Sequence, residues 1–205
     1  MGITRGCLLF IGGIVVLLLV MLGVSYCLLS LSPPLKAEMT PVLMTAEAVQ
    51  RFDQKIETFV AEIEAAVAEG QEKQVSLVIS EEEANSKLVD ILAEDDMPLE
   101  NVLINFLEGE FLACGIADIP GIDVQVVVRG RVEMMENAPK VVIENVNLGR
   151  LPLPQGMRNG IINSLLDFWV EPNEIETGLS DLPWQITDIQ ITDGQLAIVG
   201  ETTKL

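Results

Sequence analysis

The chain has 205 residues, of which 31 are Asp or Glu, 12 are Lys or Arg and none is His, so its formal net charge is −19. A negative field of this size repels phosphate backbones, and we therefore expect no nucleic-acid partner. The lack of histidine excludes His-based zinc sites and the Ser-His and Cys-His nucleophile systems.

Near the N-terminus, residues 7–31 form a run made almost wholly of Leu, Val, Ile, Met, Phe and Gly, with no charged side chain. As a helix this run would be about 37 Å long, enough to cross a hydrocarbon core of roughly 30 Å. A cleaved secretory signal has a shorter apolar core, and Tyr26 before Cys27 does not fit a lipoprotein signal. We predict an uncleaved, single-pass transmembrane anchor within residues 1–35.

The orientation of this anchor follows from the flanking charges. Arg5 precedes the span, and the positive-inside tendency places it in the cytoplasm and the C-terminal domain outside the cell membrane. Lys36, Arg51 and Lys55 lie on the far side of the span, so the reversed topology stays open.

After the anchor, prolines 33, 34 and 41 indicate a linker over residues 36–44, followed by one domain over residues 45–205. That domain is predicted to begin with an amphipathic helix over residues 45–69, capped by Thr45 and stopped by Gly70. Its apolar stripe either packs on the domain's own sheet or docks against another protein. A coiled-coil stalk is not favoured, because the stripe lacks a strict heptad repeat.

The rest of the domain alternates between strand and helix patterns. Residues 73–79 alternate like a half-buried strand, and Ser80 with Glu83 forms a capping box that begins a second helix, whose buried side we expect to be Leu88, Val89, Ile91 and Leu92. Further on, the patterns predict strands over 101–117, 122–134 and 139–148, a helix over 155–169, and a closing hairpin that turns at Asp193-Gly194. The fold class is therefore α+β, with an antiparallel meander and helices laid against it.

Several of these strands are apolar on both faces. In residues 101–107, Val102, Ile104 and Phe106 point one way and Leu103 and Leu107 the other, and residues 126–128 repeat the feature. A strand buried on both sides needs cover on each side. Helices can cover one side, and a folded-over sheet or an apolar ligand can cover the other.

The sequence does not indicate a catalytic or metal-binding site. The acidic trio Glu81 to Glu83 opens a helix, where the helix dipole favours negative charge, and the trio at residues 94–96 lacks the spacing of a calcium loop. Cys114 sits among apolar residues as a small buried hydrophobe does. We expect no catalytic residue, no metal and no cofactor, and interpret the domain as a non-enzyme.

Two stretches, SEEEANSKLVDIL and NLGRLPLPQGMRNGIINSLL, together resemble the YpmS-like family of bacterial membrane-anchored proteins, over about residues 75–200. The resemblance implies a single membrane span and, through the remote likeness of that family to tubular lipid-binding domains, a curved antiparallel sheet packed against amphipathic helices, with an apolar groove. The long helix at 45–69 departs from the family pattern.

The leading hypothesis is a binding module that holds a membrane lipid or other apolar molecule in a groove between the meander and the helix at 155–169. The predicted lining residues are Leu103, Leu107, Val126, Val128, Ile161, Leu165, Phe168 and Trp169. The alternative is a structural or adaptor protein of the cell envelope whose helix at 45–69 docks another envelope protein. The ligand and the oligomeric state stay open.

Overall fold

The computed structural model describes residues 3–94, 99–119, 122–135, 138–153, 156, 159–160 and 182–203. In chain order the elements are α1 (Ile3–Leu29), the 3-10 helix η1 (Pro34–Glu38), α2 (Ala46–Ala68), β1 (Gln74–Ser80), α3 (Glu81–Glu94), β2 (Leu99–Leu107), β3 (Glu110–Ile119), β4 (Ile122–Met135), β5 (Ala138–Leu148), β6 (Trp184–Thr192) and β7 (Gln195–Thr202). The predicted α+β class with an N-terminal apolar helix is confirmed. The helix predicted at 155–169 falls mostly outside the described residues.

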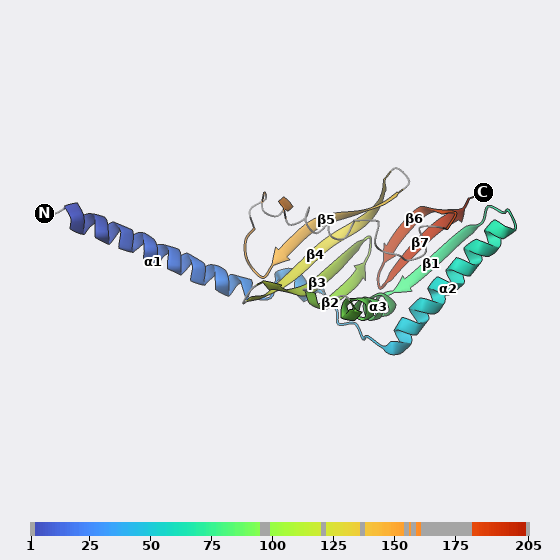
Figure 1. Ribbon diagram of the computed structural model, residues 1–205, viewed down its shortest axis with the longest axis horizontal. Coiled ribbons are helices and arrows are strands. Elements are labelled where there is room, and N and C mark those ends of the chain that lie inside the picture. Colours follow the sequence, from blue (N-terminus) through green and yellow to red (C-terminus); the bar gives the residue numbers. More distant parts are fainter. Residues whose placement is uncertain are drawn as a thin grey trace.

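Helix α1 projects away from the rest of the molecule (Figure 1). It has 27 residues, which corresponds to about 40 Å of helix. The apolar stretch Ile14–Glu38 contains a window with a mean hydropathy of 2.7, none of which is buried inside the protein. One N-terminal helix is thus long and apolar enough to cross a membrane.

Helix α2 covers one face of a three-stranded sheet with the order β1-β7-β6. Its ends are as predicted: the Thr45 hydroxyl accepts a hydrogen bond from Ala48 N–H at 3.1 Å, and Gly70 follows the helix with a positive φ of 65°. Phe59 and Ile63 are buried against Val75 and its same-face neighbours on β1. The apolar stripe of α2 therefore packs on the domain's own sheet, which is the first of the two predicted alternatives.

Helix α3 begins with the predicted capping box, since Ser80 N–H donates to Glu83 Oε2 at 2.9 Å and Glu83 N–H donates to the Ser80 hydroxyl at 3.3 Å. Its predicted buried side is wrong, however: Val89 and Ile91 are exposed, and the buried residues are Glu83, Asn85 and Ser86.

The reason is that α3 lies along the open edge of β2 instead of packing an apolar stripe on a sheet face. Asn85 Oδ1 accepts from Ile104 N–H at 2.7 Å, and Asn85 Nδ2 donates to the Ile104 carbonyl at 2.7 Å. One turn earlier, a Glu81 carboxylate oxygen accepts from Phe106 N–H. These side chains occupy the backbone groups that a neighbouring strand would otherwise use, which protects the edge from pairing with another chain.

The predicted meander forms a second, four-stranded antiparallel sheet in the order β2-β3-β4-β5. It meets the first sheet at two hairpin turns: Gly109 N–H donates to the Ile191 carbonyl at 2.8 Å, and Gly194 N–H donates to the Phe106 carbonyl at 3.0 Å. The strands therefore belong to two sheets joined at their turns (Figure 1).

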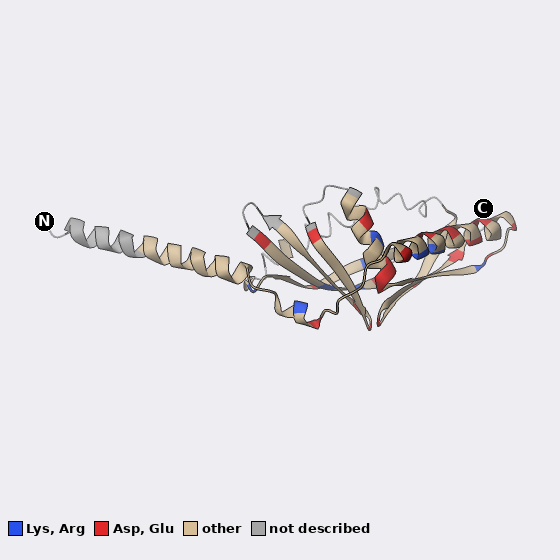
Figure 2. Cartoon of the chain, turned by 90° about the horizontal axis from the view of Figure 1, so that it is seen from below, with Lys and Arg blue, Asp and Glu red and all other residues tan. Residues whose placement is uncertain are grey.

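Residues 33–44, which we call the strap, connect α1 to α2 and include the whole segment predicted as a linker, residues 36–44. The strap lies on the side of the four-stranded sheet opposite to α2 and α3 (Figure 2). Thr40 N–H donates to Asn105 Oδ1 at 2.9 Å, Asn105 Nδ2 donates to the Thr40 carbonyl at 3.1 Å, and Glu38 pairs with Arg129. Leu35 is buried. The strap is thus bound to the domain and is not a free tether.

Candidate functional site

Both faces of the four-stranded sheet carry buried residues, as the apolar pattern predicts. Directly paired residues of an antiparallel sheet share a face, so Asn105, Leu112 and Arg129 lie on the face that the strap crosses. On that face Leu112 and Val127 are 0% exposed. Among the residues of the opposite face, Phe106, Val124 and Val146 are buried.

An apolar cleft of about 670 Å³ opens at the β2 edge of this sheet, and we call it the β2 cleft. The strap, the C-terminal half of α3 and the start of β2 form its walls. The lining residues are Pro41, Val42, Met44, Val89, Leu92, Ala93, Glu100, Asn101, Val102 and Leu103. Its volume falls within the roughly 300–1,000 Å³ typical of small-molecule sites, and its walls are mainly aliphatic.

A bulge in β2 shapes the floor of this cleft. The pairing with β3 shifts register between Glu100 and Leu103, and Asn101 takes a positive φ of 52°. Bulges bend a strand and disrupt its ladder, and asparagine tolerates the left-handed conformation better than most residues. The bulge therefore sets the first residues of β2 apart from the regular sheet beside α3.

Apolar side chains are exposed around the cleft. Of the lining residues, Met44 is 38% exposed and Val89 is 42% exposed, and Leu43, next to Met44 in the chain, is 76% exposed. Exposed apolar side chains at a cleft are typical of a site that is covered by a ligand or partner.

The register of the sheet brings the β2 cleft near the end of α1. Leu103 pairs with Cys114, Cys114 with Val127, and Val127 with Asn147, in one line across the four strands. Two residues beyond Asn147, Gly149 contacts the end of α1. Three strand spacings of about 4.8 Å put Leu103 roughly 14 Å from Asn147, and the contact of Gly149 with α1 lies two residues farther along the chain.

The contact between the domain and α1 is direct. Arg150 N–H donates to the Leu28 carbonyl at 2.8 Å, and Arg150 Nε donates to the Ser32 carbonyl at 3.1 Å. Gly149 has a φ of 52°, and a Cβ placed there would lie 2.4 Å from the Leu29 carbonyl oxygen. Only glycine fits this position, so the turn after β5 is shaped to receive the C-terminal end of α1.

The structure brings one of the predicted lining residues to the cleft. Leu103 lines it, whereas Leu107 lies on the same face but at the other end of β2. Val126 and Val128 lie half-buried on the opposite face, so they do not form one site with Leu103. The remaining predicted residues, Ile161, Leu165, Phe168 and Trp169, lie outside the described residues.

Sequence reasoning missed the strap and α3 as walls of a site. A signal for α3 was present: Leu88, Val89, Ile91 and Leu92 cover a wider arc than one buried stripe needs. No local signal indicates that residues 41–44 return to the sheet, because this depends on the contact between Thr40 and Asn105.

The acidic trio at the start of α3 has structural partners. Glu81 accepts from β2, Glu82 forms an ion pair with Arg51 at 2.9 Å, and Glu83 forms one with Lys55 at 2.7 Å. Burial by itself raises the pKa of Glu83, but hydrogen bonds from Lys55 and Ser80 and the Lys55 charge outweigh it, so the net pKa is lowered from 4.5. Glu83 is therefore a buried carboxylate that joins α2 to α3 and stays ionised.

Cys114 is a half-buried thiol in β3. Burial raises its pKa, and the charge of Lys36 offsets this only in part. A thiol with a raised pKa is mostly protonated at neutral pH, which makes it a poor nucleophile and a poor metal ligand.

No protein-family model matches this chain, and no curated protein matches it either. A functional assignment therefore depends on the geometry of the described residues. This geometry offers a mainly apolar cleft near the end of the N-terminal apolar helix.

Proposed function

We propose that this protein is a membrane-anchored binding domain that holds one acyl chain of a membrane lipid in the β2 cleft, without catalysing a reaction on it. The supporting observation is an aliphatic cleft of about 670 Å³ at the level of the anchor contact. A lipid that leaves the bilayer beside α1 meets this cleft within a short distance.

The chemistry of the cleft suits an acyl chain. Each methylene moved from water to an apolar environment contributes about 0.8 kcal/mol, so eight buried methylenes would contribute roughly 6 kcal/mol before the cost of immobilising the chain. The exposed lining residues Met44 and Val89 would lose contact with water in the same step. Specific polar chemistry is not needed for this kind of binding.

The proposal also includes the orientation of the protein in the membrane. The N-terminus lies in the cytoplasm and the domain in the extracytoplasmic space, following the charge of Arg5. The likeness to YpmS-like proteins agrees with a single-pass protein of this kind, and it stays a prediction based on two stretches of sequence.

Photolabelling of the full chain in lipid nanodiscs tests the proposal. The probe is a phosphatidylcholine whose acyl chain carries a diazirine, and the labelled peptides are identified by mass spectrometry. We expect labels on α1 from the bilayer, and in addition on the strap, α3 and the start of β2. The variant Ala93→Trp fills the cleft from an exposed helix position and should abolish the second set of labels alone.

Ala61→Trp is the matched control, because Ala61 is an exposed alanine on α2, away from the cleft. It should leave the labelling unchanged. If the labels fall on α1 only, or if those on the strap and β2 survive Ala93→Trp, the β2 cleft does not hold an acyl chain.

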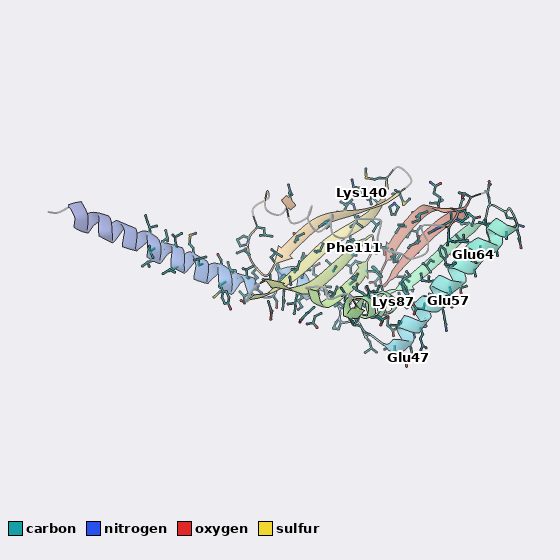
Figure 3. All side chains as sticks on the ribbon, viewed as in Figure 1. Glu47, Glu57, Glu64, Lys87, Phe111 and Lys140 are labelled. Atoms are coloured by element: carbon teal, nitrogen blue, oxygen red, sulfur yellow. The ribbon has the colours of Figure 1, made fainter. Side chains whose placement is uncertain are left out.

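A second candidate function is that of an adaptor, and the outer face of α2 favours it. Glu47, Glu57 and Glu64 lie exposed along this helix (Figure 3), and none of them forms an ion pair with another described residue. A partner with a basic surface would complement them.

A photo-crosslinking residue at position 57 distinguishes the adaptor from the lipid carrier. The adaptor predicts a defined crosslink to one membrane or envelope protein, lost when Glu47 and Glu64 are both replaced by Gln. The lipid carrier predicts no such crosslink.

A further inference from the structure

A second cleft lies at the foot of α1, on the β5 edge of the four-stranded sheet, and we call it the anchor cleft. Its volume is about 550 Å³. The residues on which the argument depends are Pro34, Asn145, Asn147, Arg150, Leu151 and Leu153. It thus combines one cation, two carboxamides and an apolar wall.

The polar groups of this cleft are available for a ligand. Arg150 is exposed and uses Nε on the Ser32 carbonyl, but it forms no ion pair with any described residue. Asn145 and Asn147 are half-buried, and their carboxamides have no hydrogen-bond partner within the described part of the chain. Because residues two apart on a strand share a face, both amides lie on the same side of β5.

Among the arginines whose side chains the structure describes, Arg150 differs in having no carboxylate partner among the described residues. Acidic residues outnumber basic ones by 31 to 12, and Arg51, Arg129 and Arg131 each have an acidic partner. Arg150 lies instead beside the end of the membrane helix. A guanidinium group with two amide donors nearby suits a phosphate group, which accepts several hydrogen bonds at once.

The depth of Arg150 relative to the bilayer follows from α1. Its backbone N–H is bonded to the carbonyl of Leu28, which is near the end of the apolar helix. Tyr26 lies about half a turn earlier and is 53% exposed, as aromatic residues at a membrane-water interface commonly are. Since the headgroup layers add roughly 5–8 Å beyond each side of the hydrocarbon core, a bilayer crossed by α1 would have its lipid phosphates at the depth of Arg150.

We propose that the anchor cleft binds the phosphate group of a membrane phospholipid, with Arg150 supplying the charge, Asn145 and Asn147 donating hydrogen bonds, and Leu151 and Leu153 contacting the start of the acyl chains. This site is separate from the β2 cleft, and it does not depend on whether an acyl chain enters that cleft. Its consequence is that a bound lipid fixes the position of the domain on the membrane surface.

Native mass spectrometry of the full chain in detergent tests the site. Dioleoyl-phosphatidylglycerol and dioleoylglycerol share their acyl chains, and only the first carries a phosphate. We expect the phospholipid to bind about tenfold more tightly than dioleoylglycerol, as a charge-assisted contact to phosphate requires, and Arg150→Gln to remove most of this preference. Asn147→Leu should reduce it in part, and Arg150→Lys should restore part of it.

Lys140→Gln is the matched control, since Lys140 is an exposed cation at the far end of β5 (Figure 3). It should leave the preference for the phospholipid intact. If the Arg150→Gln variant does not fold, the loss of phospholipid preference in the Asn147→Leu variant alone tests the proposal. Equal binding of the two lipids, or an undiminished preference in both variants, overturns the proposal.

Inorganic phosphate separates a lipid headgroup from a free anion. The apolar wall predicts that millimolar inorganic phosphate does not displace the phospholipid. Displacement by inorganic phosphate at that concentration would refute the lipid assignment. The variant Ala93→Trp should not affect this site, so the outcome is distinguishable from that of the β2 cleft.

Discussion

Replacing Asn85 by Ala should destabilise the domain strongly, although Asn85 is a polar residue in a helix. Asn85 is 0% exposed and joins α3 to the edge of β2. Its removal leaves the N–H and the carbonyl of Ile104 without these partners. Leaving a buried backbone group unsatisfied costs about 1–3 kcal/mol, so two groups give roughly 2–6 kcal/mol. Water that enters the vacated space reduces this, and we expect about 3 kcal/mol.

Urea unfolding of the full chain in detergent micelles, followed by tryptophan fluorescence, measures this loss. Trp184 is a suitable reporter, because its ring contacts Phe59 edge-on with a centroid distance of 5.1 Å. With a slope of about 2 kcal/mol per M urea, 3 kcal/mol lowers the unfolding midpoint by about 1.5 M. Asn85→Asp keeps one acceptor but faces the Ile104 carbonyl with a second oxygen, so it should not rescue the stability.

Gln50→Ala serves as the control, because Gln50 is an exposed amide on α2. Surface substitutions of this kind usually change the free energy of unfolding by no more than about 0.5 kcal/mol. If Asn85→Ala lowers the stability by no more than the control does, the side-chain contacts along β2 are not what holds α3 in place.

Three further outcomes follow from the same structure. The pKa of Glu83 is lowered in the folded state, so its stabilising contribution is present above its unfolded pKa and is lost as the pH falls through the folded pKa. The urea unfolding midpoint of the natural chain should therefore decrease below about pH 4.5. The midpoint of Glu83→Gln should decrease less over the same pH range. Gly149→Ala should speed hydrogen exchange at the Arg150 amide, because the new Cβ collides with α1, whereas Gly109→Ala has a similar positive φ but open space and should leave that amide unchanged. The Cys114 thiol, whose pKa is raised by burial, should react with iodoacetamide at pH 7.4 more slowly in the folded protein than in urea, and equal rates would contradict its placement.

Features of the fold that depend on residues close together in the sequence could be predicted. The cap at Thr45, the stop at Gly70, the box formed by Ser80 and Glu83, and the hairpin turn at Asp193-Gly194 are all present. Each of these signals acts within four residues, where a side chain or a positive φ determines the backbone directly.

The division into two sheets could not be predicted in the same way. It depends on β1 pairing with β7, for example Leu77 with Ile198, across most of the chain. Alternating apolar patterns do not specify which strands pair. The buried polar side of α3 has the same origin, since Asn85 and Glu83 are buried only because β2 and α2 lie beside them.

The sequence alone could have shown that the predicted lining residues on β2 and β4 lie on two different faces of the sheet. The turn between β2 and β3 is two residues long, and such a turn fixes the register of the flanking strands; β3 and β4 pair up to Ile119 and Ile122. Counting back from them pairs Leu103 with Cys114 and Cys114 with Val127, which places Val126 and Val128 on the other face. The sequence-based prediction pooled residues by hydrophobicity alone, and the phase between strands was lost.

Under the proposed function, the attachment of the strap determines how a chain of net charge −19 behaves beside a membrane. A free linker over residues 36–44 could extend to about 30 Å, several times the Debye length of about 8 Å at physiological ionic strength, and an acidic domain would then move away from an anionic bilayer at low salt. The bonds of Thr40 to Asn105 and of Arg150 to Leu28 remove this freedom. Photolabelling of the β2 cleft in phosphatidylglycerol nanodiscs should therefore change little between 50 and 500 mM salt.

A chain that combines ten Gly and Ser residues inserted after Leu31 with Gly149→Ala provides the comparison, because the insertion lengthens the connection to the strap and the new Cβ collides with the end of α1. In that variant the domain is free to leave the surface, so labelling of the β2 cleft should decrease at low salt and recover as salt screens the repulsion. If the natural chain shows the same salt dependence as the lengthened one, the direct contact between Gly149 and α1 does not hold the domain at the membrane.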